Sequence, residues 1–471
     1  MTSVHDLAAA GAFGELSRFR QEFYDCLSAR GDALFELTDA LLCAEGPVAS
    51  LVELSVAAEH RRGHGALYDG VNQGRVDIDR LRDAVARRRI PRCDDGRIVL
   101  AVDVSNWLRP DASTSPDRAF CHTYARGKGR TQMIPGWPYS FVAALEPGRT
   151  CWTAILDARR LRPDDNHTDL AAAQLRTVVD TLAAAGHWRE GDPDIWIVGD
   201  SGYDGPRLAF LLDDLPVRLL VRLRSDRVLA FPPPPRRPGA PGRTVRHGPR
   251  FAFADPQSWP EPAHATTADT ARYGAAHARS WDRLHPKLTR SDAWAPHEGA
   301  LPILEGTVIR LQVERLPGAS APKPLWLWFS ATASTAAQVD RLWQMFLRRF
   351  DLEHTFRFLK QTLGWTRPRL RTPAAADRWT WLVIAACAQL RLARHLVEDQ
   401  RRPWERTATT PARLSPARVR RGFRAVRLTT TAPASPPKPS RPGPGRPAGS
   451  RNSHRAPRHN PGKTPRTTAT G

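Results

Sequence analysis

Three acidic residues occur where carboxylates from distant parts of the chain could meet: Asp103, Asp200 and Glu353. Asp103 lies inside the apolar run IVLAVDVS, where an ionised carboxylate is costly unless it is paired or binds a metal ion. Asp200 ends a second apolar run, IWIVGD, and could either bind a metal ion or cap the following helix. Taken alone, the sequence context of each aspartate is compatible with either a functional or a structural role.

The segment around Glu353 is more informative because its spacing is helical. Four residues fall on one face of the predicted helix: Phe346, Arg349, Glu353 and Lys360. The opposite face is apolar and should pack on a core; it contains Leu342, Met345, Leu352, Phe356, Leu359 and Leu363. Glu353 would therefore lie between two cations along an edge that can meet the two aspartates.

Carboxylates and cations in this combination suit phosphoryl chemistry. Cleavage of a phosphodiester by water and strand transfer by a 3′-hydroxyl are in-line displacements, which two Mg²⁺ or Mn²⁺ ions assist. Mg²⁺ prefers oxygen ligands and keeps some water, so two or three carboxylates suffice. We expect Asp103 to bridge both ions, and Asp200 and Glu353 to hold one each. Arg349 and Lys360 would bind the phosphates beside the reacting bond.

Strand and helix patterns alternate around the two aspartates. Strands are predicted at residues 98–105, 139–146, 150–161, 195–200 and 217–229, and helices at residues 169–186, with Thr168 as a candidate cap, and 205–215. Three strands, a helix, a strand, a helix and a strand form a layered α/β arrangement with a mixed sheet. This order matches a ribonuclease H-like core.

The rest of the chain divides by composition into further units. We expect a helical domain (1–92), the first part of the core (93–230), a β-rich insertion (231–332), the second part of the core with the Glu353 helix (333–400) and a basic tail (401–471).

The tail carries roughly seventeen Lys and Arg against a single acid, Glu405. Because such a composition buries little apolar surface, the tail is predicted to be disordered. Its Arg, Gly and Pro stretch could lie in a DNA minor groove or could be a nonspecific solvated tail.

The overall composition favours a polyanionic partner. The formal net charge is +22, and Lys and Arg gain affinity for nucleic acid by releasing counterions from phosphates. A GC-rich genome explains Arg over Lys but not the excess of basic over acidic residues. The six cysteines show no zinc spacing and indicate reduced thiols. No signal peptide is visible, and the apolar run at 379–390 is too short to span a bilayer, so we expect a core helix and a cytoplasmic, nucleoid-associated protein without membrane contact.

Three blocks of the sequence, AVDVSNW, VGDSGYDG and FLRRFDLEHTFRFLKQTLGW, resemble the catalytic blocks of DDE-type bacterial insertion-sequence transposases. The resemblance covers about residues 97–400 and is to the branch with a β-rich insertion before the catalytic Glu and a Y-x2-R-x3-E-x6-K signature, in which Phe346 here replaces the Tyr. It implies a ribonuclease H-like fold and metal-dependent cleavage and strand transfer of double-stranded DNA at terminal inverted repeats. It also implies end recognition by the N-terminal region and a homodimeric synaptic complex.

Two further groups could contact DNA. The basic loop after Asp103 contains His122, Arg126, Lys128 and Arg130, and is either a phosphate-contact loop or a solvated turn. In the resembled family a Trp of the insertion can stack on an extruded base. The candidates, for which core packing is the alternative, are Trp259, Trp281, Trp294, Trp326 and Trp328. Asp157, Asp204 and the acidic cluster at 164–169 are predicted to be turn or cap residues.

Two alternatives to an active transposase remain. The chain could be a catalytically inactive or co-opted DNA-binding protein derived from a transposase, or a metal-dependent nuclease of the same fold that does not join strands. Three acids together with Arg349 and Lys360 favour an active enzyme, because a pure DNA-binding protein does not need them.

Overall fold

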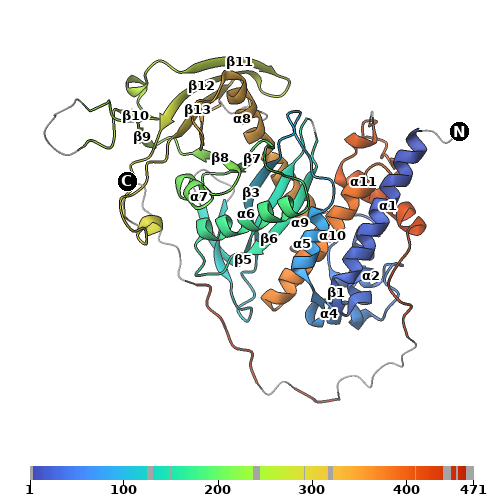
Figure 1. Ribbon diagram of the computed structural model, residues 1–471. Helices are drawn as coiled ribbons and strands as arrows, with labels where there is room; N and C mark the ends of the chain where they lie inside the picture. Colours follow the sequence, from blue (N-terminus) through green and yellow to red (C-terminus); the bar gives the residue numbers. More distant parts are fainter. Residues whose placement is uncertain are drawn as a thin grey trace.

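The computed structural model describes residues 4–124, 131–148, 150–236, 244–290, 292–316, 322–408, 410–438, 447–451 and 454–462. Its centre is a mixed sheet with the order β11-β12-β13-β14-β8-β7-β3-β5-β4, in which β6 also pairs with β5 (Figure 1). The core strands are β3 (Val99–Leu108), β4 (Ala119–Tyr124), β5 (Thr131–Leu145), β6 (Thr153–Arg160), β7 (Ile195–Gly199) and β8 (Val217–Leu223).

Strand directions confirm the predicted ribonuclease H-like fold class. β3 is antiparallel to β5 and parallel to β7, β5 is antiparallel to β6, and β7 is parallel to β8. Every residue of β7 is buried, as expected for a parallel strand covered on both faces. Two helices of the core, α6 (His167–Ala184) and α7 (Gly205–Leu211), follow β6 and β7 in the predicted places. The sequence analysis missed β4, which pairs only with the first part of β5.

The insertion has β character, as predicted. Its strands are β10 (Arg250–Ala252), β11 (His264–Thr270), β12 (Gly274–Leu284), β13 (Gly306–Val313) and β14 (Leu325–Phe329). The strand predicted at 217–229 is divided: β8 ends at Leu223, and a separate strand, β9 (Val228–Ala230), pairs with β10 of the insertion. β14 pairs antiparallel with β8, so the strands from β11 to β14 continue the central sheet. Short 3₁₀ turns lie at η1 (Pro256–Ser258) and η2 (Asp292–Trp294). A second hydrophobic cluster, rich in Phe and Trp, holds this part of the chain together.

The N-terminal region is helical, as predicted, and it packs around a helix from the C-terminal half. Its elements are α1 (Val4–Asp25), α2 (Gly31–Cys43), α3 (Leu51–Ser55), α4 (His64–Gln73), α5 (Ile78–Ala86) and a small pair of strands, β1 (Leu27–Ala29) and β2 (Arg75–Val76). Buried Arg20 of α1 donates to Asp39 of α2 at 2.7 Å and to Gln389 of α10 (Pro373–Ala393) at 2.6 Å. The apolar run at 379–390 is thus part of a core helix.

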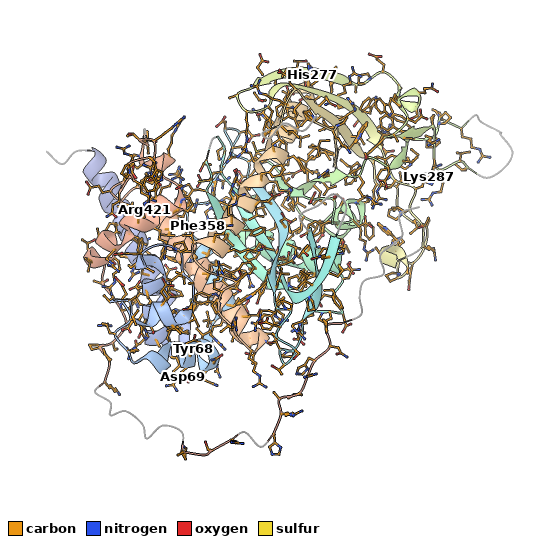
Figure 2. All side chains as sticks on the ribbon, turned by 180° about the vertical axis from the view of Figure 1, so that it is seen from behind. Tyr68, Asp69, His277, Lys287, Phe358 and Arg421 are labelled. Atoms are coloured by element: carbon orange, nitrogen blue, oxygen red, sulfur yellow. The ribbon has the colours of Figure 1, made fainter. Side chains whose placement is uncertain are left out.

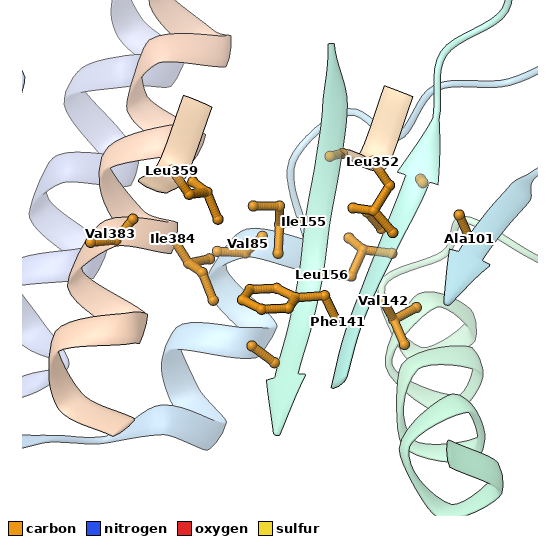
Figure 3. Packing of buried hydrophobic residues seen from close by; sticks show 14 of the residues in the cluster. Val85, Ala101, Phe141, Val142, Ile155, Leu156, Leu352, Leu359, Val383 and Ile384 are labelled. Atoms are coloured by element: carbon orange, nitrogen blue, oxygen red, sulfur yellow. The ribbon is translucent and has the colours of Figure 1, made fainter. Parts of the chain in front are cut away.

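Helix α10 also covers the sheet. Figure 3 shows Phe141 and Ile155 of the sheet facing Ile384 of α10, Leu359 of the Glu353 helix and Val85 of α5, all within one buried cluster. None of the helices among the described residues combines the length and apolar character needed to cross a membrane.

The prediction of a disordered tail is wrong for residues 416–429, which form α11 (Pro416–Thr429) after a short turn, η3 (Pro411–Arg413). Val419 and Phe423 of α11 are fully buried, and the helix packs against α2 and α10. Figure 2 shows Arg421 of α11 beside the N-terminal helices and well away from His277 in the insertion. The composition hid this helix because its apolar stripe is short.

Carboxylates from outside α11 neutralise most of its arginines. The ion pairs are Arg418 with Asp399, Arg421 with Glu405, Arg424 with Glu59 and Arg427 with Asp39. Part of the tail's positive charge therefore stabilises the fold and is not available to an external partner.

Replacing Phe423 by Ala should lower the free energy of unfolding by about 3–5 kcal/mol, because the ring is fully buried between helices. Urea denaturation of the full chain would measure the change. Leu428→Ala is the matched control on the same helix, since Leu428 is 71% exposed, and it should shift stability by less than about 0.5 kcal/mol. Equal stability of the two variants would mean that α11 does not pack as described.

Candidate active site

Asp103 and Asp200 lie on neighbouring parallel strands. Val102 of β3 pairs with Gly199 of β7, so the residue after each is one of the two aspartates. The capping alternative for Asp200 does not hold, because Asp204 is the N-cap of α7 and accepts from the Arg207 N–H. One carboxylate oxygen of Asp200, Oδ1, is buried without a hydrogen-bond partner among the described residues. Such an oxygen is costly unless a cation or a donor reaches it.

Asp103 is held by two donors. Its Oδ1 accepts from the backbone N–H of Val104 at 2.8 Å, and its Oδ2 accepts from Nη1 of Arg349 at 2.6 Å. Burial raises the pKa of Asp103 to about 6, although Arg349 and the Val104 N–H both lower it. The charges of Asp200 and Glu353 raise it further, which places all three carboxylates within electrostatic reach of one another.

The predicted long helix is divided at Arg349 into α8 (Ala336–Arg348) and α9 (Phe350–Gln361). Arg349 itself keeps helical backbone angles, and its side chain is only 5% exposed. Its guanidinium spans two of the acids, because Nη2 also lies 3.1 Å from Oε1 of Glu353, whose side chain is 48% exposed. The opposite face is buried as predicted, with Leu342, Leu352, Leu359 and Leu363 fully enclosed.

The other two residues of the predicted helix face support this arrangement. Phe346 is buried, with its ring centroid 5.8 Å from the Arg349 guanidinium, so it packs against Arg349. Nζ of Lys360 lies 5.8 Å from the ring centroid of Trp365. Burial lowers the pKa of Lys360, while the charges of Cys121 and Asp103 act in the opposite direction. Lys360 therefore faces the same side of the core as Asp103.

The three acids have the oxygen ligands that a divalent cation prefers, although their side chains are not arranged around one metal position in this structure. No group of three His, Cys, Asp or Glu side chains within the described ranges is arranged to hold a metal ion. Instead Arg349 lies between Asp103 and Glu353 and neutralises both. The buried, unpartnered Oδ1 of Asp200 and the half-exposed Glu353 side chain, which can turn, fit the oxygen ligands that Mg²⁺ requires.

Tyr203 is a residue of the site that the sequence analysis overlooked. Burial raises the pKa of its hydroxyl, as do the charges of Asp103 and Asp200. Tyr203 follows the second acid, Asp200, in the block VGDSGYDG, and this nearness in the sequence could have identified it as a residue of the site. Its ring also packs 3.5 Å from where a side chain at Gly199 would begin, which fixes the end of β7.

The predicted phosphate-contact loop is only partly described. His122 lies in β4, where its backbone carbonyl accepts from Asn106 Nδ2 at 2.9 Å. Arg126, Lys128 and Arg130 lie outside the described residues.

The insertion tryptophans pack in the interior of the protein: Trp259, Trp281, Trp326 and Trp328 in the cluster of the insertion, and Trp294 against Phe210 of α7. Trp281, Trp294, Trp326 and Trp328 are buried. Trp259 is partly buried, and its indole N–H donates to the Ala252 carbonyl at 2.7 Å. Packing, the alternative to base stacking, therefore accounts for all five in this structure.

Asp204 and the cluster at 164–169 cap helices as predicted, whereas Thr168 and Asp157 do not. Asp204 caps α7, and the cluster at 164–169 caps α6 through Asn166, which accepts from the backbone N–H groups of Thr168 and Asp169. Thr168 is thus inside the helix and is not its cap. Asp157 is a correction: it is fully buried in β6 and pairs with Arg82 and Arg159.

Comparison with protein families identifies the family of the chain. The family described as DDE superfamily endonuclease matches residues 22–287, more than half of the chain, and the chain belongs to this family. The matched residues include Asp103 and Asp200, whereas Glu353 lies beyond them, so its assignment rests on the contacts described above. No curated protein matches the chain.

Proposed function

We propose that this chain is a DNA transposase that cleaves the strands of an insertion sequence at its terminal inverted repeats and transfers them to a target. Asp103, Asp200 and Glu353 are its catalytic residues. The observation that carries the proposal is the buried Arg349 contact with Asp103, which joins residues 246 positions apart beside the unpartnered oxygen of Asp200. The branch with the β-rich insertion and the Y-x2-R-x3-E-x6-K signature is part of the proposal.

Asp103, Asp200 and Glu353 would hold two Mg²⁺ or Mn²⁺ ions. Bound there, the ions supply activation of the attacking oxygen and stabilisation of the leaving oxygen. Arg349, released from the carboxylates, can donate two parallel hydrogen bonds to a phosphate. Phe346 keeps the Arg349 guanidinium in place by packing against it. Lys360 adds a second cation on the same side of the core.

DNA is the partner in this proposal, with transposon ends and target both bound as duplexes. Two copies of the chain would hold two ends together, and the helical region formed by α1 to α5 would recognise the end sequence. The loop with Arg126, Lys128 and Arg130 remains a predicted phosphate contact. The net charge of +22 supports a polyanionic partner for the whole chain.

An inactive or co-opted DNA-binding protein is the alternative. The buried pair of Asp103 and Arg349 argues against it, because a desolvated ion pair adds little stability over an apolar replacement and is not needed for binding DNA elsewhere. A nuclease of the same fold that cuts DNA without joining strands would differ from a transposase only in its reaction products.

The test uses the purified full chain, a linear DNA that carries the gene with its flanking genomic sequence, and a supercoiled target plasmid. With Mg²⁺ we expect free 3′-hydroxyl ends at the element boundaries and joined products in the plasmid. Removal of the metal by EDTA should abolish both, and added Mg²⁺ should restore them. Cleavage without joined product would identify a nuclease, and no cleavage with Mg²⁺ or Mn²⁺ would disprove the enzymatic proposal.

A further inference from the structure

Three arginines project from the segment that follows the Glu353 helix. Between α9 and α10, Arg367, Arg369 and Arg371 are exposed, whereas the intervening Pro368 and Leu370 are buried. Alternate exposure of this kind places the three arginine side chains on the solvent side of the segment, with the intervening residues turned toward the core. We call these three residues the arginine strip.

Among the described residues, the three side chains of the strip have no ion-pair partner. No hydrogen bond or ion pair joins the three guanidinium groups to any carboxylate in the described part of the chain. The neighbouring acid Asp377 is already engaged by Tyr139 and Arg160. This contrasts with the arginines of α11, most of which have carboxylate partners. The charge of the strip is therefore available to an external partner.

A buried arginine on the core side holds the backbone of the strip in place. Buried Arg109, which directly follows β3, donates from Nη1 to the carbonyl of Leu370. The Arg109 guanidinium also lies 5.1 Å from the ring centroid of Trp137. Arg109 is a positioning residue: it fixes the strip in one conformation, which reduces the entropy lost when a ligand binds.

Positive charge accumulates around this anchor. Burial lowers the pKa of Arg109, and Arg118 and Arg369 lower it further, while Asp111 acts in the opposite direction. Arg118 donates to the carbonyl of Arg109 at 3.0 Å and to that of His459 at 2.9 Å. The positive charges of Arg109, Arg118 and Arg369 repel one another, and Asp111 offsets part of this repulsion. A bound polyanion would relieve the rest.

The strip is continuous with the catalytic site. Along α9 the chain passes from Glu353 to Lys360, and Lys360 then lies against Trp365, two residues before the strip. The ring centroid of Trp365 lies 6.0 Å from that of Trp107, near the end of β3 and four residues after Asp103. Lys360, near the end of α9, thus lies in the chain between Glu353 and the strip and contacts the residue two positions before Arg367.

We propose that the arginine strip binds the sugar-phosphate backbone of duplex DNA beside the bond that is cleaved. The inference rests on the proposed function, because it takes DNA as the substrate. Phosphates recur along each strand every 3.4 Å or so of helix axis, so an extended row of cations can engage several of them, whereas an acidic protein surface seldom offers such a row. The strip reads no sequence and sets the register of the duplex.

The test measures binding to a fluorescent duplex of random sequence in EDTA, where no cleavage occurs, across a range of salt concentrations. For the triple variant R367A/R369A/R371A, the slope of log K against log salt should become shallower by about 3 relative to wild type. The triple variant R367K/R369K/R371K should keep most of the slope, because Lys retains the charge.

The matched control is R189A/R227A/R250A, which removes the same charge from three exposed positions away from the strip. Its slope should equal that of wild type, and the melting temperatures of all variants should agree. A wild-type slope in R367A/R369A/R371A would overturn the proposal, as would binding of the strip to polyglutamate but not to DNA. If wild type fails to cleave DNA in Mg²⁺ but the strip variant still loses slope, the proposed function fails and the strip stands.

Discussion

Replacing Glu353 by Gln is expected to reduce DNA cleavage by on the order of 10³-fold or more while leaving the free energy of unfolding within about 0.5 kcal/mol of wild type. The two effects separate because the Glu353 side chain is 48% exposed and its pair with Arg349 is half in solvent. Losing a metal-ligating carboxylate, in contrast, removes an interaction on which the reaction depends.

The measurement compares cleavage rates in Mg²⁺ with urea denaturation of the same preparations. Glu190→Gln is a matched control, because Glu190 is an exposed carboxylate in the turn between α6 and β7, at the end of β7 opposite Asp200. It should leave cleavage unchanged. If Glu353→Gln cleaves DNA at the wild-type rate, Glu353 is not the third acid, and the site would have to be sought elsewhere on α8 or α9.

Much of the fold could be predicted because local pattern and final structure agree. The apolar runs that contain Asp103 and Asp200 are buried parallel strands, and the apolar positions of the Glu353 helix are buried in the core. In such elements the burial pattern follows directly from the spacing of the residues. The order of strands and helices then restricts the topology to few choices.

The structure differs from the sequence-based prediction where an element depends on contacts with residues far away in the sequence. Two arginines of α11 are compensated by Glu59 and Asp39, which are 365 and 388 positions away from them in the sequence. Likewise, nothing local shows that β14 pairs with β8 and extends the central sheet. Composition alone counts charges and cannot show which of them are paired.

The same distinction between local contacts and contacts of distant residues applies to the candidate site. Helical spacing predicts that Arg349 and Glu353 are neighbours, and they are. It cannot predict that Arg349 also bonds to Asp103, 246 positions away. The residue pattern predicts that Arg349 contacts a phosphate, whereas in this structure its guanidinium neutralises Asp103 and Glu353. We infer that Arg349 stabilises the carboxylates before DNA and metal ions bind and contacts phosphate afterwards.

This dual role makes Arg349 the residue whose loss should affect both stability and activity. Arg349→Met keeps the length of the side chain but leaves Asp103 desolvated and without its counterion. We expect the free energy of unfolding to fall by about 3 kcal/mol, because the Arg349 side chain is 5% exposed and the pair is buried. Cleavage should fall on the order of 10²–10³-fold, since a cation beside the reacting phosphate is lost.

A double-mutant cycle identifies the cause. In an Asp103→Asn background the carboxylate is already absent, so adding Arg349→Met should cost clearly less than about 3 kcal/mol, with the difference measuring the Asp103 pair. Arg348→Met is the control from the adjacent position, where the partners are Asp351 and backbone carbonyls of the β5–β6 connection, and its cost should be the same in both backgrounds. Equal losses for Arg349→Met in the two backgrounds would show that Arg349 does not act through its pair with Asp103 but through packing on Phe346 and Phe350 or its pair with Glu353. Only a coupled loss agrees with an arginine that holds the catalytic acids together until their ligands arrive.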